Sequence, residues 1–364
     1  MLLRRLSMSN VRATGELSVE VGPALTILVG PNGAGKTSVL EAVALALGGT
    51  QLRAGAMRDM ITHARDHLRV EVELEEEGRA LTACAAHSRQ GDRRLTADGL
   101  ALTDHSRWRE SIPVRTFVPD DLRLIKGSPR RRRIYLDSLA AARDPGYAVL
   151  LRDYEEALTQ RNSLLRGRTG GDEETQFSPW EQILAETGLA VGGKRAAALG
   201  DFIQAFQDMH RDLTGEPMDA FRLTYRTNVA GLDEDAYRDR LRESRPADRQ
   251  RTFTHLGPHR DDFRLTRAGL DMRECASQGE QRAALLTLVL AEWDQLRESG
   301  PSPLLLLDDV MSELDEHRRR SLVKVVSRGG QVLMTTTDLR YFADEELAAA
   351  EVVEMRGGTY DGRA

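Results

Sequence analysis

The sequence predicts an α/β fold that is interrupted by a mostly helical second lobe, and three observations support this prediction. A short apolar run at 25–29 leads through a glycine-rich segment into a helix-forming run. A second apolar run, at 304–307, belongs to a closing block in which strands and helices alternate. Between these blocks, apolar residues recur every three or four positions, which is the helical period. We therefore expect a split α/β domain of residues 1–121 and 246–364 and a helical domain of residues 122–245.

Alternation and turn signals predict mostly strands in the first block. The expected elements are hairpin strands at 2–8 and 17–21, a buried strand at 25–29, a helix at 36–47, an antiparallel β-subdomain at 69–102 and a central strand at 114–118. The middle of the chain is expected to form helices at 134–142, 147–165, 180–214 and 235–244, with a mobile loop at 167–174. The closing block is expected to contain strands at 263–266, 304–307, 331–335 and near 352–353, with helices at 279–297 and 316–327.

Composition limits the class of protein. The chain has 364 residues and a formal net charge of −6, so any basic surface for nucleic acid must be local. Cys84 and Cys275 form no C-x-x-C pair, which argues against a zinc clip or a disulfide framework. No run approaches the roughly 18 consecutive apolar residues of a membrane span. We therefore expect a cytoplasmic protein that does not enter a membrane.

The glycine-rich segment from Gly30 to Thr37 has the spacing G-x-x-x-x-G-K-[ST] between a strand and a helix. This pattern is typical of a P-loop, in which backbone N–H groups surround nucleotide phosphates at a helix N-terminus. Lys36 is expected to reach the β- and γ-phosphates, and the Thr37 hydroxyl is expected to bind Mg²⁺. The candidate nucleotide-binding residues are Gly30, Asn32, Gly33, Gly35, Lys36, Thr37 and Ser38.

Asp308 and Asp309 follow the apolar strand 304–307. An aspartate at the carboxyl edge of a parallel sheet lies beside the Mg²⁺ of a P-loop, so Asp308 is the candidate metal ligand. Asp309 projects differently and is placed to orient or deprotonate an attacking water, which makes Asp309 and Lys36 the candidate catalytic residues. The alternative is a buried strand whose following turn begins with two aspartates.

The segment from Ser277 to Gln281, with the sequence S-Q-G-E-Q, allows two interpretations. Ser277 and Glu280 fit the S-x-x-E capping box, which would only begin a helix. Ser277 and Gly279 also offer a hydroxyl and bare backbone N–H groups at a helix N-terminus, which suits a phosphate. The order of motifs favours the second interpretation: a P-loop, an insertion, this segment, an acidic pair, and then S-E-L-D at 312–315.

That order resembles the arrangement of ABC-type ATPases, in which the S-x-G-[GE]-Q signature and the D-loop act across a dimer. Two stretches make the resemblance more specific. Pro119 to Asp137 and Leu256 to Asp262 are similar to hallmarks of the RecF family of bacterial recombinational-repair ATPases. The resemblance covers essentially the whole chain. It implies an ABC-type ATPase head with mixed and antiparallel sheets, similar to SMC-like heads, and a compact helical lobe in place of coiled-coil arms.

The resemblance implies ATP and Mg²⁺ as ligands. It assigns Asp309 to the position of the usual catalytic Glu, Arg12 to a phosphate contact and Asp315 to the D-loop. It places Ser277, Gly279 and Gln281 on the signature that reaches the γ-phosphate held by a partner subunit. Two positions depart from the family pattern: Asp120 stands near the expected Q-loop glutamine, and Thr337 stands where a switch histidine is common. A shorter base and a missing histidine predict weak, slow hydrolysis in which ATP times dimerisation.

Arg130, Arg131, Arg132 and Arg133 follow Ser128-Pro129, a pair typical of a helix N-terminus. Cations in a first helical turn oppose the helix dipole, so these arginines are candidates for binding the DNA backbone or for an intersubunit contact. The alternative is that they pair with Asp120, Asp121 and Asp137. The segment His259 to Asp262 is expected to be a polar turn, and in this family part of a hinge between lobes.

The resemblance implies an ATP-dependent homodimer that binds double-stranded DNA or junctions with single strands, shows DNA-stimulated ATP hydrolysis, and acts with RecR and RecO to load RecA on gapped DNA. Two other functional classes are alternatives. An SMC-like or ABC-type structural subunit acting on a protein partner would need coiled-coil arms or a membrane partner, which the sequence does not offer. A P-loop kinase would leave the segment Ser277 to Gln281 unexplained.

Overall fold

The computed structural model describes residues 1–48, 52, 56–102, 108, 111–118, 122–167, 172–217, 220–356 and 359–361. The chain folds into two units. Unit 1 comprises Met1–Asp121, Asp208–Glu216 and Ser277–Ala364, and unit 2 comprises Leu122–Gln207 and Pro217–Ala276. The return to the first domain, expected at residue 246, would fall inside helix α7 (Glu234–Arg251). In the structure the chain enters unit 1 briefly at Asp208–Glu216 and returns to it finally at Ser277.

Unit 1 contains a six-stranded sheet in the order β15-β14-β3-β13-β12-β8. Strand β15 runs antiparallel to β14, and the other neighbours are parallel. Strands β12 and β13 are buried along their whole length, as expected for parallel strands covered on both faces. The strand bounds are β3 Leu25–Val29, β8 Val114–Phe117, β12 Leu304–Leu307, β13 Gln331–Thr336, β14 Glu351–Arg356 and β15 Thr359–Asp361.

The prediction of a central strand at 114–118 was wrong. Within the described residues, β8 pairs with β12 alone and therefore lies at the edge of the sheet. Its first three residues are only half-buried, and Arg115 forms an ion pair with Glu292 at 2.8 Å. The apolar run of a short strand predicts that it joins a sheet, but it does not predict its place in the strand order.

A second sheet of unit 1 is antiparallel, in the order β2-β1-β4-β5-β6-β7. The predicted hairpin is confirmed, because β1 and β2 pair with Val11 opposite Thr14. In β4, buried and less buried residues alternate, so one face of the sheet is covered by the core and the other faces solvent. The strand bounds are β1 Leu2–Val11, β2 Thr14–Glu20, β4 His67–Glu76, β5 Arg79–Ser88, β6 Arg93–Ala97 and β7 Leu100–Ala101.

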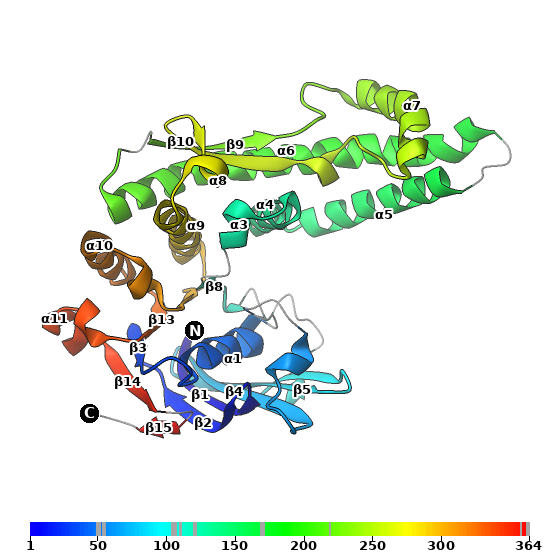
Figure 1. Ribbon diagram of the computed structural model, residues 1–364. Helices are drawn as coiled ribbons and strands as arrows, with labels where there is room; N and C mark the ends of the chain where they lie inside the picture. Colours follow the sequence, from blue (N-terminus) through cyan, green and yellow to red (C-terminus); the bar gives the residue numbers. More distant parts are fainter. Residues whose placement is uncertain are drawn as a thin grey trace. The chain divides into compact units, whose positions relative to one another are not determined.

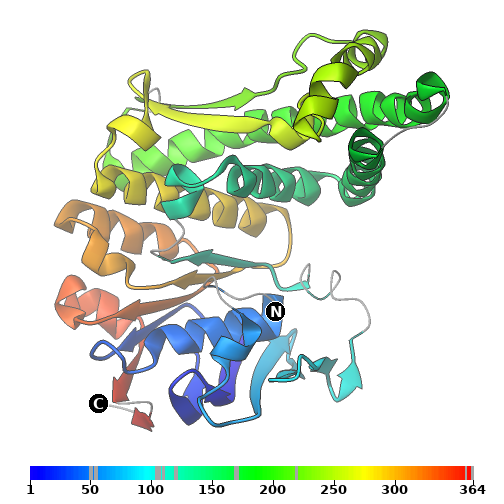
Figure 2. The same cartoon turned by 45° about the vertical axis from the view of Figure 1, so that its right-hand side comes forward.

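Helix α1 (Lys36–Gly48) follows the P-loop and packs between the two sheets of unit 1 (Figure 2). It contacts β1, β4 and β5 of the antiparallel sheet, and β13 and β8 of the parallel sheet. Its residues 38–47 are all buried, so α1 is a core helix rather than an amphipathic surface helix. The first turn of α1 lies at the edge where the parallel strands end, since Thr37 hydrogen-bonds Asp308 and Gly30 N donates to Thr336 O.

Two longer helices complete the closing block of unit 1, α9 (Gln278–Ser299) and α10 (Glu316–Val326). Trp293 anchors α9, because its ring is fully buried and its Nε1 donates to Pro303 O at 3.1 Å. A Cβ at Gly330 would lie 2.6 Å from this ring, so a glycine is required there. The remaining short segments are Met57–Met60, Val310–Glu313, Leu339–Tyr341 and α11 (Asp344–Ala348).

Unit 2 is mostly helical, with α5 and α6 lying along each other (Figure 1). It also holds a three-stranded sheet in the order β11-β10-β9. The helix bounds are α3 Arg123–Lys126, α4 Pro129–Arg143, α5 Tyr147–Arg166, α6 Glu173–Thr214 (of which 208–214 belong to unit 1), α7 Glu234–Arg251 and α8 Met272–Cys275. The strand bounds are β9 Phe221–Arg226, β10 Asp262–Arg267 and β11 Leu270–Asp271. Among the described residues, no helix is long and apolar enough to cross a bilayer.

Sequence patterns misplaced two features of unit 2. The predicted loop at 167–174 was too long, because Asp172 accepts hydrogen bonds from Glu174 N and Thr175 Oγ1 and so starts α6 at Glu173. Residues 168–171 of that stretch lie outside the described residues. Strand β9 was missed, although it alternates buried and exposed residues and pairs along its full length with β10.

A buried network of charged side chains joins α5, α6 and α7. Arg161 is fully buried and donates from Nε to Glu181 (3.1 Å) and from Nη1 to Asp248 (2.7 Å) and Thr254 Oγ1 (2.8 Å). Its Nη2 donates to Leu241 O at 2.7 Å. Because both carboxylates are also buried, each charge in this network depends on its partners.

Candidate nucleotide-binding site

The backbone of the P-loop depends on two glycines. Gly33 and Gly35 have φ angles of +83° and +94°, which residues with a side chain rarely adopt. A Cβ at Gly33 would meet nothing within 4 Å, so space is left open beside the loop. A Cβ at Gly35 would approach Thr14 Oγ1 at 3.0 Å. Gly30 is required for a different reason, because a Cβ at this position would lie 2.3 Å from Met355 O of β14. Packing of the loop on the sheet thus requires Gly30 whether or not a ligand binds.

Lys36 folds back over the loop that precedes it. Its Nζ donates to Gly30 O at 2.6 Å and to Pro31 O at 2.9 Å, which uses two of the three ammonium N–H groups. The side chain is 7% exposed, and burial lowers its pKa while Asp309 and Asp308 act in the opposite direction. A buried ammonium suits an anionic ligand, since an anion would compensate for the lost hydration.

Asp308 and the Thr37 hydroxyl lie side by side. Thr37 Oγ1 donates to Asp308 Oδ1 at 2.8 Å, and Asp308 is 4% exposed at the end of β12. Hydroxyl and carboxylate oxygens are the ligands that Mg²⁺ prefers. Thr335 of β13 also donates to Asp308 Oδ1 at 2.8 Å and was not predicted. The signal that would have found Thr335 is a polar residue at the carboxyl end of the strand that neighbours the acidic pair.

Asp309 has a strained backbone and an unsatisfied carboxylate oxygen. Its φ is +48°, and its N donates to Thr335 Oγ1 at 2.8 Å. Its Oδ2 accepts from Ser312 Oγ at 2.7 Å, whereas Oδ1 is buried without a hydrogen-bond partner in the described part of the chain. Left-handed backbone at a residue with a side chain and a buried orphan oxygen both cost free energy, and both are typical of functional sites. The orphan oxygen can accept a hydrogen bond from a water bound in the site.

Together these residues fit a magnesium nucleotide. The P-loop leaves space beside Gly33, Lys36 supplies positive charge, and Thr37 with Asp308 supplies oxygen ligands for a hard cation. Asn32 is exposed at the tip of the loop, and Ser38 is buried in the first turn of α1. The described residues contain no cluster of three or more His, Cys, Asp or Glu side chains with metal-binding geometry, so the metal would depend on this pair and on the nucleotide.

Ser277 begins α9 through the predicted capping box. Its Oγ accepts from Glu280 N at 3.3 Å, and Glu280 Oε2 accepts from Ser277 N at 2.7 Å. A Cβ at Gly279 would meet nothing within 4 Å, so the backbone of this first turn can be approached closely. Gln281 is buried in the next turn. The cap therefore coexists with an open helix N-terminus.

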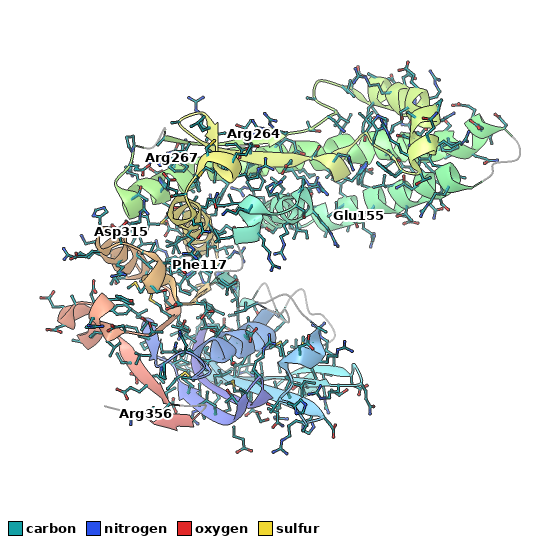
Figure 3. All side chains as sticks on the ribbon, viewed as in Figure 1. Phe117, Glu155, Arg264, Arg267, Asp315 and Arg356 are labelled. Atoms are coloured by element: carbon teal, nitrogen blue, oxygen red, sulfur yellow. The ribbon has the colours of Figure 1, made fainter. Side chains whose placement is uncertain are left out.

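Asp315 caps α10 and lies at the start of that helix (Figure 3). Its Oδ1 accepts from Arg318 N at 2.9 Å. The preceding residues connect this segment to α9, because Glu313 forms an ion pair with Arg282. The candidate D-loop and the helix of the candidate signature are thus linked within one chain.

Arg12 lies at the turn between β1 and β2 and is held by a carboxylate. Its Nη2 and Nε donate to the two oxygens of Glu41 at 2.7 and 3.0 Å, and Nη1 donates to Asp59 O at 2.9 Å. Hydrogen bonding to Glu41 raises the pKa of Arg12 despite its partial burial. Sequence reasoning did not single out Glu41, because a lone Glu in an apolar helix carries no motif.

The four consecutive arginines of α4 have different environments. Arg130 and Arg131 are exposed. Arg132 is 2% exposed and donates to both Asp262 oxygens, at 2.5 and 3.0 Å, so it is not available to a DNA phosphate and its place among the DNA-binding candidates was wrong. Arg133 is half-buried and donates to Asp261 O at 3.1 Å.

Of the expected alternative partners of these arginines, Asp120, Asp121 and Asp137, the last lies in the described part of the chain. Asp137 accepts from Arg195 Nε at 2.7 Å instead. Asp120 and Asp121 lie outside the described residues, so the placement of Asp120 near the Q-loop position stays a prediction. Thr337 is exposed just after β13.

The segment around His259 is packed more tightly than a polar turn. His259 Nε2 contacts Thr254 O at 2.8 Å, and because a carbonyl only accepts, Nε2 carries the proton. Nδ1 then accepts from Tyr154 Oη at 2.6 Å, and burial lowers the pKa of His259 to about 4. Gly257 has φ +129°, and a Cβ there would lie 2.3 Å from Tyr237 Oη. The segment therefore interlocks with α5 and α7.

Comparison with known proteins finds relatives that extend over almost the whole chain. Residues 2–357 match the RecF/RecN/SMC N terminal domain family. The DNA replication and repair protein RecF of Heliobacterium modesticaldum is 34% identical over 372 residues, covering 98% of each chain. The protein of the same name from Moorella thermoacetica is 36% identical over 361 residues, covering 98% of this chain and 95% of the relative.

Among solved structures, the recombination mediator protein RecF-ATP of the RecFOR pathway matches with a TM-score of 0.84 and 27% identity, covering 100% of this chain and 98% of that one. An SMC head bound to the C-winged helix domain of ScpA matches with a TM-score of 0.56 at 16% identity, covering 99% and 96%, and shows a shared fold. The chain belongs to the RecF/RecN/SMC N-terminal domain family, and its full-length relatives place it among the RecF proteins.

Proposed function

We propose that this chain binds MgATP and that two copies close head-to-tail over two ATP molecules to hold DNA. The observation that carries the proposal is the juxtaposition of Lys36, Thr37, Asp308 and Asp309 around a P-loop with open space beside it. The solved RecF structure named with ATP supports the choice of nucleotide.

Each residue of the site has a distinct role in this proposal. Lys36 exchanges its contacts with Gly30 O and Pro31 O for phosphate oxygens, and the N–H groups of the P-loop bind the remaining phosphate charge. Thr37 and Asp308 hold Mg²⁺, which when bound neutralises charge on the phosphates. The free Oδ1 of Asp309 orients the attacking water. Because Asp309 is one methylene shorter than glutamate, we expect hydrolysis to be slow.

In this proposal, a second copy of the chain supplies the signature residues that one chain does not bring to its own P-loop. Ser277 and Asp315 hydrogen-bond within their own helices, and no hydrogen bond or ion pair of the described residues joins either of them to Lys36 or Thr37. The first turn of α9 is exposed at Ser277 and Gly279, so its N–H groups and the Ser277 hydroxyl can meet the γ-phosphate of a partner's ATP. Each site is then composed of the P-loop of one chain and the signature of the other.

The relatives' names extend the proposal to DNA. Curated relatives are called DNA replication and repair proteins, and the solved neighbour is called a recombination mediator of the RecFOR pathway. We infer that the ATP-bound dimer binds double-stranded or gapped DNA in the cytoplasm, that DNA stimulates its weak ATPase, and that it acts with RecR and RecO to place RecA.

Replacing Ser277 by arginine is expected to abolish ATP-dependent dimerisation while MgATP binding by the monomer stays within about twofold of wild type. An arginine at the first turn of α9 would occupy the space that the partner's γ-phosphate needs, but it would leave the P-loop of its own chain intact. Analytical ultracentrifugation with ATP and with ADP measures assembly, and equilibrium nucleotide titration measures binding.

Ser138→Arg is the matched control, because Ser138 is an exposed helical serine of unit 2. It should dimerise like wild type. The composite-site proposal fails if Ser277→Arg dimerises normally with ATP, or if the wild-type chain stays monomeric with ATP at every concentration and with gapped duplex present.

Removing both Arg130 and Arg131 is expected to weaken DNA binding and to flatten its salt dependence. These arginines are exposed, unlike Arg132, so each can neutralise one phosphate. The slope of log K against log salt should therefore decrease by about 2 in magnitude. A binding isotherm series in increasing salt tests this, with the exposed arginines Arg152 and Arg166 of α5 replaced as a control pair. Equal slopes for wild type and Arg130→Ala/Arg131→Ala would exclude these two arginines from the DNA interface.

A further inference from the structure

Helix α1 contains a charged side chain that its packing does not require. Glu41 lies among apolar residues of a core helix and is 0% exposed. A buried carboxylate costs several kcal/mol unless it is paired, and its replacement by an apolar side chain often leaves stability unchanged or improved. Stability alone would therefore favour an apolar residue at position 41, so the carboxylate calls for another explanation.

The partner of Glu41 is Arg12, and the pair is bidentate. Two parallel N–H···O bonds of 2.7 and 3.0 Å hold the guanidinium in one orientation. A third bond, from Nη1 to Asp59 O at 2.9 Å, fixes it from the other side. A guanidinium has five N–H groups, and these three bonds leave two that no described residue accepts. The side chain is 28% exposed, so the remaining N–H groups can reach solvent or a ligand.

The backbone of this turn is fixed as firmly as the side chain. Arg12 has a φ of +55°, and its N donates to Met60 O at 2.6 Å. Thr62 N donates to Asn10 O at 2.9 Å and Thr62 Oγ1 donates to Thr14 O at 3.4 Å, so the backbone before and after Arg12 is hydrogen-bonded to the segment 57–62. A left-handed arginine is maintained only where its surroundings impose it. Placing the Arg12 guanidinium against Glu41 therefore requires an unfavourable backbone conformation.

The pair lies beside the P-loop. Glu41 is four residues after Thr37, so the two side chains share one face of α1, one turn apart. Thr14 begins β2 directly after the turn that carries Arg12. It lies close to the P-loop, since a Cβ at Gly35 would be 3.0 Å from Thr14 Oγ1. The turn that carries Arg12 is therefore in contact with the loop that binds phosphate in the proposed function.

We propose that Glu41 is a positioning residue, which holds the Arg12 guanidinium at the edge of the P-loop so that its remaining N–H groups meet a phosphate oxygen of the bound nucleotide. This inference rests on the proposed ATP site and adds Glu41 to it. Glu41 does not contact the ligand itself. It acts through the Arg12 guanidinium, which is oriented before the nucleotide binds.

A double-mutant cycle on MgATP affinity tests the inference. Glu41→Gln and Arg12→Ala are each expected to weaken equilibrium binding of MgATP by about tenfold, because each removes an oriented charged donor from the phosphate. In the Arg12→Ala background, Glu41→Gln should have no further effect beyond about twofold, since its partner is already absent. Arg12→Lys, which keeps the charge but loses the bidentate fork, should bind nearly as weakly as Arg12→Ala.

Controls separate a positioning role from a structural one. Glu292→Gln removes the carboxylate of another half-buried ion pair of unit 1, with Arg115, and should leave MgATP affinity unchanged. Thermal melts without nucleotide establish that each variant is folded. If Glu41→Gln does not fold, Arg12→Lys and Arg12→Ala decide: wild-type affinity in both overturns the inference.

The inference is also overturned if Glu41→Gln binds like wild type, or if its effect in the double variant multiplies that of Arg12→Ala. Lys36→Ala distinguishes this failure from failure of the ATP site. If Lys36→Ala loses MgATP binding while Glu41→Gln retains it, the site stands and only the role of Glu41 falls. If Lys36→Ala binds normally, the proposed site itself is wrong.

Discussion

Replacing Lys36 by alanine is expected to weaken MgATP binding by about 100-fold or more. The ammonium is buried and hydrogen-bonded to two P-loop carbonyls, which a phosphate would replace with stronger charge-assisted bonds. Hydrogen bonds to charged groups contribute about 1.5–3 kcal/mol each, and every ~1.4 kcal/mol is tenfold in affinity. Without Lys36, the phosphates would also face Asp308 and Asp309 with less compensating charge.

Isothermal titration with MgATP measures the effect of Lys36. Lys126→Ala is the matched control, because Lys126 is an exposed lysine at the end of α3, and it should bind MgATP like wild type. Lys36→Arg should also bind poorly, since a planar guanidinium does not fit a contact that Nζ makes with two adjacent carbonyls. A Lys36→Ala affinity within threefold of wild type would contradict the assignment of the P-loop.

Replacing Arg161 by methionine is expected to lower the free energy of unfolding by about 3–5 kcal/mol, because it removes the cation that is hydrogen-bonded to both buried carboxylates, Glu181 and Asp248. Glu181 keeps hydrogen bonds from Arg245. Asp248 keeps its bonds from His255 and Ser244, but it loses one of the bonds that hold its pKa below the ordinary value against the effect of burial. Urea unfolding followed by circular dichroism measures the loss.

The control for Arg161 lies on the same helix. Arg152 is 70% exposed, so Arg152→Met should change the unfolding free energy by no more than about 0.5 kcal/mol. If Arg161→Met lowers the free energy of unfolding by less than about 1 kcal/mol, the buried charged network does not stabilise unit 2 as proposed. The variant should still bind MgATP when folded, because Arg161 belongs to unit 2 and the P-loop belongs to unit 1.

Much of unit 1 follows from sequence because its patterns are local. Continuous apolar runs predicted the buried parallel strands, alternation predicted the β1–β2 hairpin, and the glycine spacing predicted the strand–loop–helix around Lys36. The proximity of Thr37 and Asp308, which are 271 positions apart, was expected because parallel strands end at a common edge. Local patterns are sufficient to predict this part of the site because the sheet itself supplies the long-range geometry.

Other features depend on long-range pairing that no local pattern shows. The edge position of β8, the burial of Arg132 against Asp262, and the attachment of Arg12 to Glu41 each require two distant segments to meet. An arginine run looks the same in sequence whether it faces solvent or a buried carboxylate. Thr335 was missed for a related reason, since its role depends on its neighbouring strand.

Mixing two inactive variants tests the composite ATP site most directly. Lys36→Ala lacks a P-loop contact but keeps Ser277, and Ser277→Arg keeps the P-loop but lacks the signature. Each alone is expected to sediment as a monomer in a slowly hydrolysed ATP analogue. Mixed in equal amounts, they should form a heterodimer, because the P-loop of one and the signature of the other complete one intact site. A mixture that stays monomeric at concentrations well above those at which wild type dimerises would contradict completion of the site by a second chain.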